Sequence, residues 1–308
     1  MNGVLLVDKA SGPTSHDVVH QVRKALGIRG IGHAGTLDPM ASGLLVLLVG
    51  EATKISDYIL NGDKAYQVGV RLGLRTDSYD LTGEVLEDRD VTVSETAVRE
   101  ALASLTGEIE LEVPKHSAVK VDGRKLYERA HRGETIEALP KRVMRFDAPT
   151  ELRVQGREVS FHVQCSKGSY IRALAHALGE KIGTGGTLSA LRRTLSAPFE
   201  LADAVSVPAL TEAWEARQQR DGRVWGSAWI RLADALPGFR RVDLDGQDAY
   251  LLRNGQISRS LQAELLRFIQ VGETPPPVRV VHRESKELMA ILIAEPGQFY
   301  RIRRVFNA

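Results

Sequence analysis

The sequence predicts an α+β fold with a mixed, largely antiparallel sheet, followed by a small β-rich domain. Strand-like and helix-like segments are mixed between residues 3 and 200, but they lack the steady rhythm of βαβ units. Near residue 235 the pattern changes to short strand-like segments separated by turns. A chain of 308 residues is long enough for about two domains. We therefore expect one domain at 1–235 and a second at 236–308.

The strands expected in the first domain rest on hydrophobic periodicity. Residues 3–7 and 44–49 are continuous apolar runs typical of buried strands, and residues 66–72 alternate as a half-buried strand does. Two further strand-like runs lie within residues 151–165, on either side of Gln155-Gly156-Arg157. This spacing predicts a hairpin.

Three helices are expected in the same domain. Apolar residues three or four positions apart, with start and stop residues at the ends, predict helices near 15–26, 93–105 and 170–182. The first has Thr14 and Ser15 as its start residues and stops at Gly27. The last stops at Gly183, and glycine is favoured at a helix end.

The second domain is expected to consist mainly of short strands. Its predicted turns are Asp245-Gly246, Asn254-Gly255 and Pro296-Gly297. A helical stretch at 261–269 interrupts the strands, and the prolines at 275–277 require an extended connection.

Composition excludes several classes of protein. The chain is 43% hydrophobic and 26% charged, which is ordinary for a globular protein. Its apolar runs are far shorter than the roughly 20 residues that cross a bilayer, and its start lacks the features of a signal peptide. We therefore expect a cytoplasmic protein without membrane contact. The single cysteine, Cys165, excludes an intrachain disulfide and a cysteine-based zinc cluster.

Charge is distributed unevenly along the chain, although the net charge is only +2. Residues 77–112 carry eleven acidic residues and two arginines, whereas residues 115–145 carry nine basic and four acidic residues. Residues 236–308 carry eleven basic residues, ten of them arginine, against eight acidic ones. Because arginine binds phosphate as a planar fork and stacks on bases, this distribution favours a nucleic-acid partner.

Two other motifs fit a ligand-binding pattern, but their sequence context does not support binding. Gly30–Gly35 fits the G-x-G-x-x-G pattern, but it follows a predicted helix instead of leaving a strand, so we reject dinucleotide binding. His16 and His20 have metal-binding spacing on a helix, but no further ligand is evident nearby. We expect no metal and no cofactor.

The two segments richest in candidate functional residues are 32–43 and 165–172. In the first, Asp38 lies among glycines that allow a ligand to approach closely, but Asp38-Pro39 also fits a helix start or a turn cap. The second joins a predicted strand to a predicted helix, and its Lys167 and Arg172 suit an anion. A simple strand-to-helix connection explains it as well.

Taken together, these segments resemble the motifs of the TruB family of bacterial tRNA pseudouridine synthases, whose members act on the T-loop uridine conventionally numbered 55. The likeness covers about residues 2–200. The matching segments are 2–9, 32–43, 50–54, 71–73 with Thr76-Asp77, Ser117-Ala118 with Lys120, 165–172 and 191–193. The arginine-rich tail is similar, more loosely, to the PUA domain of many such enzymes.

The resemblance implies a role for each of several residues. Asp38 matches the catalytic aspartate that starts cleavage of the uridine C1′–N1 bond, by attack on the base, attack on the sugar or removal of a sugar proton. Tyr66 matches the tyrosine that stacks on the target base, and Arg172 the arginine that pairs with the catalytic carboxylate. Leu191 matches a position on the apolar wall of the pocket, and His33 matches the residue that enters the T-loop as the uridine flips out. The remaining substrate-binding positions are Tyr170 and Lys9.

The resemblance also implies a partner and an alternative. The expected partner is the T-arm stem-loop of tRNA, bound by a monomer. A noncatalytic RNA-binding or RNA-folding protein on the same scaffold is the alternative, but it has no use for Asp38 beside Tyr66 and Arg172, since a carboxylate repels phosphate. A glycoside hydrolase normally needs a second carboxylate in a comparable setting, and the sequence offers none.

Overall fold

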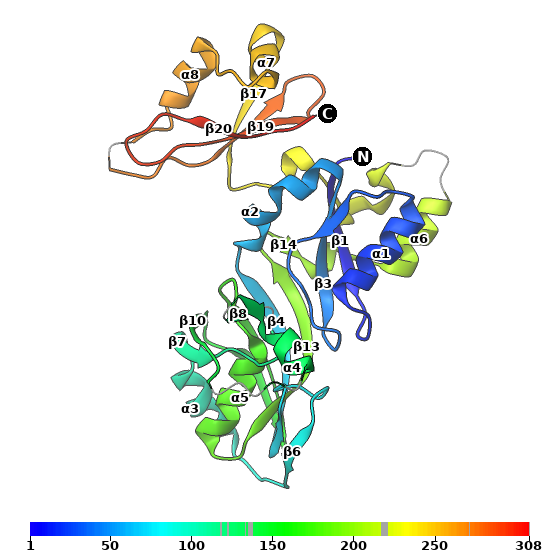
Figure 1. Ribbon diagram of the computed structural model, residues 1–308, viewed down its shortest axis with the longest axis vertical. Helices are drawn as coiled ribbons and strands as arrows, with labels where there is room; N and C mark the ends of the chain where they lie inside the picture. The colour runs from blue at the N-terminus through cyan, green and yellow to red at the C-terminus, as the bar shows by residue number, and fades with distance from the viewer. Residues whose placement is uncertain are drawn as a thin grey trace.

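The structure is a computed structural model that describes residues 1–308 except 118, 122, 133, 135–137, 217–220, 271 and 308. Its described residues form one large sheet of twelve strands, a separate sheet of four strands, and two small strand pairs. The four-stranded sheet lies at one end of an elongated molecule (Figure 1). No helix in the described part of the chain is long and apolar enough to cross a membrane.

The large sheet is mixed and mostly antiparallel, as the sequence predicts. Its main order is β15-β1-β3-β13-β4-β12-β10-β7, with β2, β11, β14 and β16 at the sides. The strands are β1 (Gly3–Lys9), β2 (Ile31–His33), β3 (Ser42–Val49), β4 (Lys64–Leu72), β7 (Gly107–Glu112), β10 (Lys141–Phe146), β11 (Thr150–Gln155), β12 (Glu158–Cys165), β13 (Gly186–Ser196), β14 (Phe199–Glu200), β15 (Val205–Ser206) and β16 (Trp229–Arg231).

Two halves of this sheet meet at β3 and β13. These strands pair in parallel through Arg192 with Ser42 and Arg193 with Gly43. On one side β3 pairs with β1, and on the other β13 pairs with β4, both in antiparallel register. The start of β3 follows the glycine-rich segment that carries Asp38, so this segment lies beside the line where the two halves join.

The remaining elements before residue 236 are short strands and helices. The small strands are β5 (Leu74–Thr76) with β6 (Val85–Asp88), and β8 (Lys120–Val121) with β9 (Arg124–Lys125). The helices are α1 (Ser15–Leu26), α2 (Ser56–Leu60), α3 (Glu95–Ser104), α4 (Leu126–His131), α5 (Ile171–Ile182) and α6 (Val207–Glu215), with 3₁₀ segments η1 (Gly50–Ile55), η2 (Leu201–Asp203), η3 (Gly222–Ala228) and η4 (Leu232–Asp234).

Local sequence explains the first helix. The Thr14 side chain accepts a hydrogen bond from the backbone of Asp17, and Asp17 accepts one from the backbone of Thr14, which forms a capping box. Gly27 ends α1 with φ 70°, a conformation that favours glycine. The apolar face, which includes Val18 and Val22, is buried. The predicted helices at 93–105 and 170–182 and the hairpin of β11 and β12 are confirmed within a few residues.

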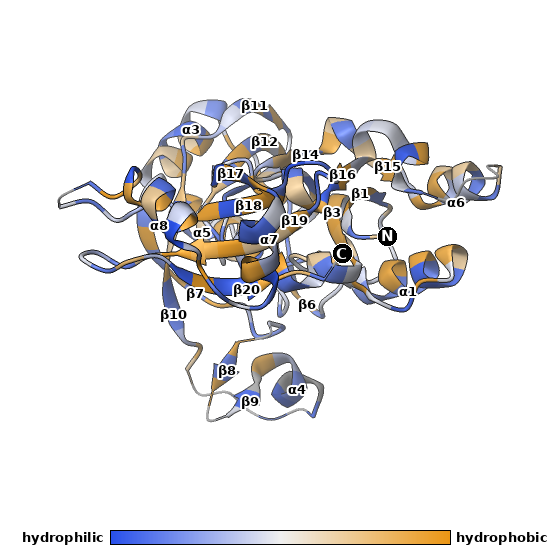
Figure 2. Cartoon of the chain, turned by 90° about the horizontal axis from the view of Figure 1, so that it is seen from above, coloured by the Kyte–Doolittle hydropathy of each residue, from blue (hydrophilic) through white to orange (hydrophobic). Residues whose placement is uncertain are grey.

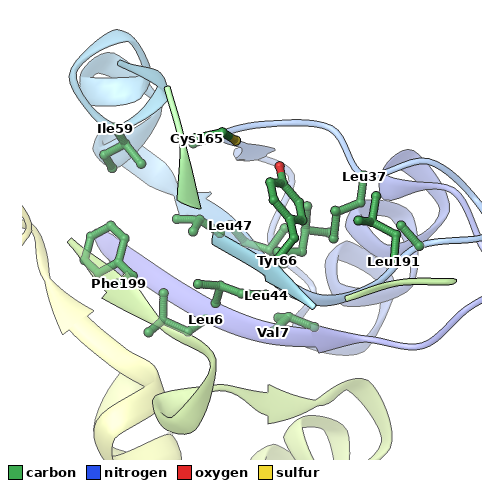
Figure 3. Close-up of a cluster of buried hydrophobic side chains, with 14 of the residues drawn as sticks. Leu6, Val7, Leu37, Leu44, Leu47, Ile59, Tyr66, Cys165, Leu191 and Phe199 are labelled. Carbon is green, nitrogen blue, oxygen red and sulfur yellow. The ribbon is translucent and has the colours of Figure 1, made fainter. Parts of the chain in front are cut away.

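One core extends beneath the large sheet and the candidate site. Figure 3 shows Leu6, Leu44, Leu47 and Phe199 in this core, with Tyr66 and Leu191 toward one side. Leu6, Leu44 and Leu47 are at most 1% exposed. Full burial of such a side chain contributes about 1.5–3 kcal/mol, so this core holds the strands that carry the site in fixed register.

The C-terminal part is β-rich, as expected. Its strands and helices are β17 (Arg240–Leu244), α7 (Gly246–Arg253), α8 (Arg259–Leu266), β18 (Val278–His282), β19 (Leu288–Ile293) and β20 (Arg301–Val305). The strands form the order β17-β18-β19-β20, and they share a buried cluster with α7 and α8.

Two expectations for this part need correction. Asp245-Gly246 is not a turn between strands, because Asp245 precedes α7, whose Ala249 and Leu252 are buried in the small core. The helix expected at 261–269 begins earlier and ends at Leu266, because Ser258 accepts a hydrogen bond from the Leu261 N–H and caps it. In the stretch 261–277, residue 271 lies outside the described residues.

Candidate active site

A cavity of about 570 Å³ lies where the Asp38 segment, β4, β13 and the start of α5 meet. A further side is closed by three residues, His116, Ser117 and Tyr127. Figure 2 shows that β8, β9 and α4 project from one face of the molecule. Five of the predicted site residues line the cavity: Asp38, Tyr66, Tyr170, Arg172 and Leu191.

Backbone geometry fixes the segment that carries Asp38. The Ala41 N–H donates to the Asp38 carbonyl at 3.0 Å, which closes a turn through Pro39, and no helix follows. The interpretation of Asp38 as a helix cap is therefore wrong. Gly43 has φ 97°, and a Cβ atom there would lie 2.4 Å from the Arg193 carbonyl oxygen, so β13 can approach only a glycine.

Arg172 forms an ion pair with Asp38. Its Nε lies 3.0 Å from Asp38 Oδ2, and its Nη2 donates to Asp38 Oδ1 at 3.4 Å. The same guanidinium donates to the carbonyls of His116 at 3.0 Å and Ser78 at 3.4 Å. Arg172 is 5% exposed, whereas the Asp38 side chain is 33% exposed. The carboxylate therefore faces the cavity while the guanidinium supports it from behind.

The surroundings of Asp38 act on its pKa in opposite directions. Burial raises the pKa of Asp38, the Arg172 guanidinium lowers it, and the nearby Asp80 carboxylate raises it. The net result is a pKa above the usual value. Arg172 is thus what favours the ionised carboxylate in a site that otherwise disfavours charge.

Asp80 is a site residue that sequence reasoning missed. Its Oδ2 lies 3.6 Å from Arg172 Nη1, on a side chain that is 5% exposed. Its Oδ1 accepts hydrogen bonds from Ser78 Oγ, Thr82 Oγ1 and the Thr82 N–H. Serine and threonine two positions before and after an aspartate are a signal for such a tight polar turn, but Asp80 lies in the acidic stretch and was not singled out.

Tyr66 and Leu191 form the apolar wall. Tyr66 on β4 pairs with Arg193 on β13 and with Val163 on β12, and both Tyr66 and Leu191 are 8% exposed. Figure 3 shows Tyr66, Leu37 and Leu191 grouped together. Burial raises the pKa of Tyr66, which keeps its hydroxyl neutral. The wall can therefore take a flat, uncharged ring.

Besides Arg172, two buried cations line the cavity, Arg193 and Lys64, and sequence reasoning singles out neither of them individually. A further buried cation, Lys9, lies outside the lining. Arg193 is 1% exposed and donates to the carbonyls of Leu44 at 2.7 Å and Gly35 at 3.1 Å. Lys64 donates to the Gly62 carbonyl at 2.5 Å, and burial lowers its pKa to about 8. Lys9 is 0% exposed, and its Nζ donates to three backbone carbonyls: those of Ala10, Pro13 and Pro39.

Two predicted site residues, Lys9 and His33, are not part of the cavity lining. Lys9 lies beneath the Asp38 segment, which it ties to β1 through the Pro39 carbonyl. His33 ends β2 and pairs with Leu47, and its Nδ1 is buried without a partner among the described residues. Burial lowers the pKa of His33, which favours its neutral form.

The junction at 165–172 joins β12 to α5, as expected. Lys167 Nζ donates to Asn61 Oδ1 at 2.8 Å, and Arg172 is engaged by Asp38. Within the described residues, no group of three or more histidine, cysteine, aspartate or glutamate side chains could hold a metal ion. Of the Ser117-Ala118 motif, Ser117 lines the cavity and residue 118 lies outside the described residues.

Comparison with known proteins adds family information. Residues 23–171 match the model for the N-terminal domain of TruB family pseudouridylate synthase, and residues 172–236 match that for the tRNA pseudouridylate synthase B C-terminal domain. The chain is 45% identical to tRNA pseudouridine synthase B of Bdellovibrio bacteriovorus, over 99% of this chain and 97% of that one. The chain is 38% identical to the Geobacillus thermodenitrificans protein of the same name, over 97% of this chain and 96% of that one.

The fold has solved relatives as well. A chain in the crystal structure of a Cbf5-Nop10-Gar1 complex superposes with a TM-score of 0.72 at 23% identity, covering 99% of this chain and 85% of that one. A chain in an H/ACA RNP bound to a substrate RNA containing 2′-deoxyuridine superposes with a TM-score of 0.71 at 22% identity, covering 99% of this chain and 85% of that one. At such identity these matches establish the fold alone.

Proposed function

The chain belongs to the TruB family of pseudouridylate synthases, and from this premise we propose that it isomerises the T-loop uridine of tRNA with Asp38 as the catalytic carboxylate. The observation that carries the proposal is the Asp38 carboxylate, held 3.0 Å from the Arg172 guanidinium and open to a 570 Å³ cavity. Tyr66 and Leu191 line the same cavity, which suits a flipped pyrimidine.

The reaction is an isomerisation in which the C1′–N1 bond breaks and a C1′–C5 bond forms after the ring turns. Asp38 can start it by attack on the base, by attack on the sugar or by removal of a sugar proton. Each route needs the ionised carboxylate. After the new bond forms, the proton on C5 must leave and N1, which has lost its bond to C1′, must take up a proton, so that the product is an isomer of uridine. A carboxylate is a base of suitable strength to remove the C5 proton.

Arg172 and Asp80 keep this carboxylate in place. Arg172 lies between the two carboxylates, 3.0 Å from Asp38 and 3.6 Å from Asp80. Asp80 is itself held by three hydrogen bonds, so it fixes the guanidinium on the side away from the cavity. We assign Arg172 to stabilisation of the Asp38 charge and to positioning of the carboxylate, and Asp80 to positioning alone, through the guanidinium that it holds.

The remaining predicted residues are assigned to substrate handling. Flipping a base costs a few kcal/mol of lost stacking, and the Tyr66 ring with Leu191 offers a replacement surface. Tyr170 contributes to the lining of the same cavity. His33, on β2, is assigned to the space that the base leaves in the T-loop. Lys9 supports the Asp38 segment through the Pro39 carbonyl, so we assign it to positioning.

We assign the rest of the RNA to the basic regions. Residues 115–145, which include the projecting β8, β9 and α4, carry an excess of five positive charges. The tail at 236–308 carries an excess of three, and we interpret it as a PUA-like RNA-binding domain that follows a catalytic domain at 1–235. The proposed partner is the T-arm of tRNA, bound by a monomer in the cytoplasm.

The decisive experiment is incubation of the purified protein with unmodified tRNA, followed by mapping of pseudouridine at single-nucleotide resolution. We expect one modified position, in the T-loop, both in whole tRNA and in an isolated T-arm stem-loop. The alternative, a noncatalytic RNA-folding protein on this scaffold, predicts RNA binding without any pseudouridine. Modification confined to another position would refute the assignment of the substrate.

A further inference from the structure

Ser117 carries a buried hydroxyl that has no partner. The residue is 5% exposed, its Oγ is inaccessible to solvent, and that atom has no hydrogen-bond partner within the described part of the chain. Ser117 nevertheless lines the 570 Å³ cavity. Because an unpaired buried hydroxyl is unfavourable, such an atom at a cavity wall indicates a partner that arrives with the ligand.

The backbone around Ser117 is held firmly. Its carbonyl accepts a hydrogen bond from the Tyr127 N–H at 3.0 Å, at the start of α4. The carbonyl of the preceding residue, His116, accepts one from Arg172 Nη2, also at 3.0 Å. The backbone that carries the Ser117 hydroxyl is thus held by α4 on one side and by Arg172 of the Asp38–Arg172 ion pair on the other.

We propose that the Ser117 hydroxyl donates a hydrogen bond to a ring carbonyl of the flipped uracil. The inference deepens the proposed function and rests on it. In that function Tyr66 and Leu191 contact the faces of the ring, and Asp38 acts next to the glycosidic bond. The polar edge of the ring then meets the remaining lining, to which Ser117 contributes an unused donor.

The symmetry of the uracil ring allows one donor to bind a ring carbonyl both before and after the ring turns. A half-turn of uracil about its N3–C6 axis brings C5 to the place of N1, as the reaction requires, and exchanges the carbonyls at C2 and C4. A donor fixed in the protein therefore meets a carbonyl oxygen before the turn and an equivalent one after it. Ser117 would hold both orientations without any change in its own protonation.

The test compares Ser117→Ala with a matched control, Ser196→Ala. Ser196 is 0% exposed and its Oγ also lacks a partner among the described residues, but it does not line the cavity. Neither substitution removes a hydrogen bond from the free protein, so both variants should melt no lower than the parent. Ser117→Ala should lose roughly 10-fold in kcat/KM on a T-arm stem-loop. Ser196→Ala should keep the parent value.

Substrate analogues identify the group that Ser117 contacts. Stem-loops with 2-thiouridine or 4-thiouridine at the target replace one ring carbonyl by a weaker acceptor, and a 2′-deoxyuridine version removes the sugar hydroxyl. In the parent, at least one thio substitution should slow the reaction, and in Ser117→Ala the same substitution should cost several-fold less.

Equal thio effects in the two proteins, or coupling only to the 2′-hydroxyl, would overturn this inference. So would parental kcat/KM in a folded Ser117→Ala variant. A parent that makes no pseudouridine in the unmodified stem-loop overturns the proposed function and this inference with it. An active parent without coupling overturns this inference alone.

Discussion

Replacing Arg172 by methionine should shift the acid limb of the pH–rate profile toward neutral pH. At the observed 3.0 Å between Arg172 Nε and Asp38 Oδ2, the pair interaction is about 1.4 kcal/mol at the dielectric of water and about 5 kcal/mol at an effective dielectric of 20. Because the Asp38 side chain is 33% exposed, we expect a value between these limits. Loss of this interaction therefore raises the pKa of Asp38 further, because the guanidinium is the main group that lowers it.

The direction of the effect follows from the groups that remain. Burial and Asp80 both raise the pKa of Asp38, and Arg172 opposes them. Without the guanidinium, Asp38 takes up its proton at a higher pH, so the active, ionised form is lost sooner as the pH falls. The variant should also be slower at its optimum, because the carboxylate loses its orientation.

The assay is the single-turnover rate on a T-arm stem-loop, measured from pH 5 to 9. Arg172→Lys is the matched control, since it keeps the charge but loses the second hydrogen bond, and its acid limb should stay closer to that of the parent. A melt of each variant checks the fold, because removal of one partner from a buried ion pair is destabilising by about 3–5 kcal/mol. If a folded Arg172→Met enzyme shows the parental profile, the role assigned to the ion pair is wrong.

Three further predictions concern the rest of the site and the tail. Asp38→Asn should abolish pseudouridine formation while tRNA affinity, measured by filter binding, stays within a few-fold, because no basic RNA contact is removed; single-turnover product from this variant would contradict the assignment of Asp38. Exhaustive chelation should leave the rate on the T-arm stem-loop unchanged, and activity that one specific metal restores would show that a metal is needed. A protein ending near Leu236 should bind whole tRNA more weakly, and the slope of log K against log salt concentration should be flatter by about 0.7–0.9 for each lost phosphate contact. It should still modify the stem-loop at nearly the parental rate. Unchanged affinity and slope in a truncated protein that melts cooperatively would exclude an RNA-binding tail.

The elements that the sequence predicts well are those whose signal is local. The helix α1 is specified by Thr14, Asp17 and Gly27 within its own length, and β3 by a continuous apolar run. The turn expected at Asp245 failed because aspartate followed by glycine fits a hairpin as well as a helix start. Burial of Ala249 in the small core decides in favour of the helix.

The residues missed in the site act over long separations. Asp80 is recognised only through its contact with Arg172, and Arg193 only through the carbonyls of Gly35 and Leu44 that it binds. The residue pattern around Asp80 or Arg193 does not indicate these contacts, because their partners lie far away in the sequence. Ser117 belongs to a motif of the sequence, but the lack of a hydrogen-bond partner for its hydroxyl among the described residues depends on the three-dimensional structure.

The meeting of β3 and β13 also has a consequence for folding kinetics. Asp38 and Arg172 are 134 positions apart, and Asp38 lies just before β3, which pairs in parallel with β13 through Ser42 and Arg192. Contacts of such high sequence separation form late, because the intervening chain must be ordered first. On dilution from denaturant, helical circular dichroism should therefore recover earlier than enzymatic activity, and the activity should report completion of the whole sheet.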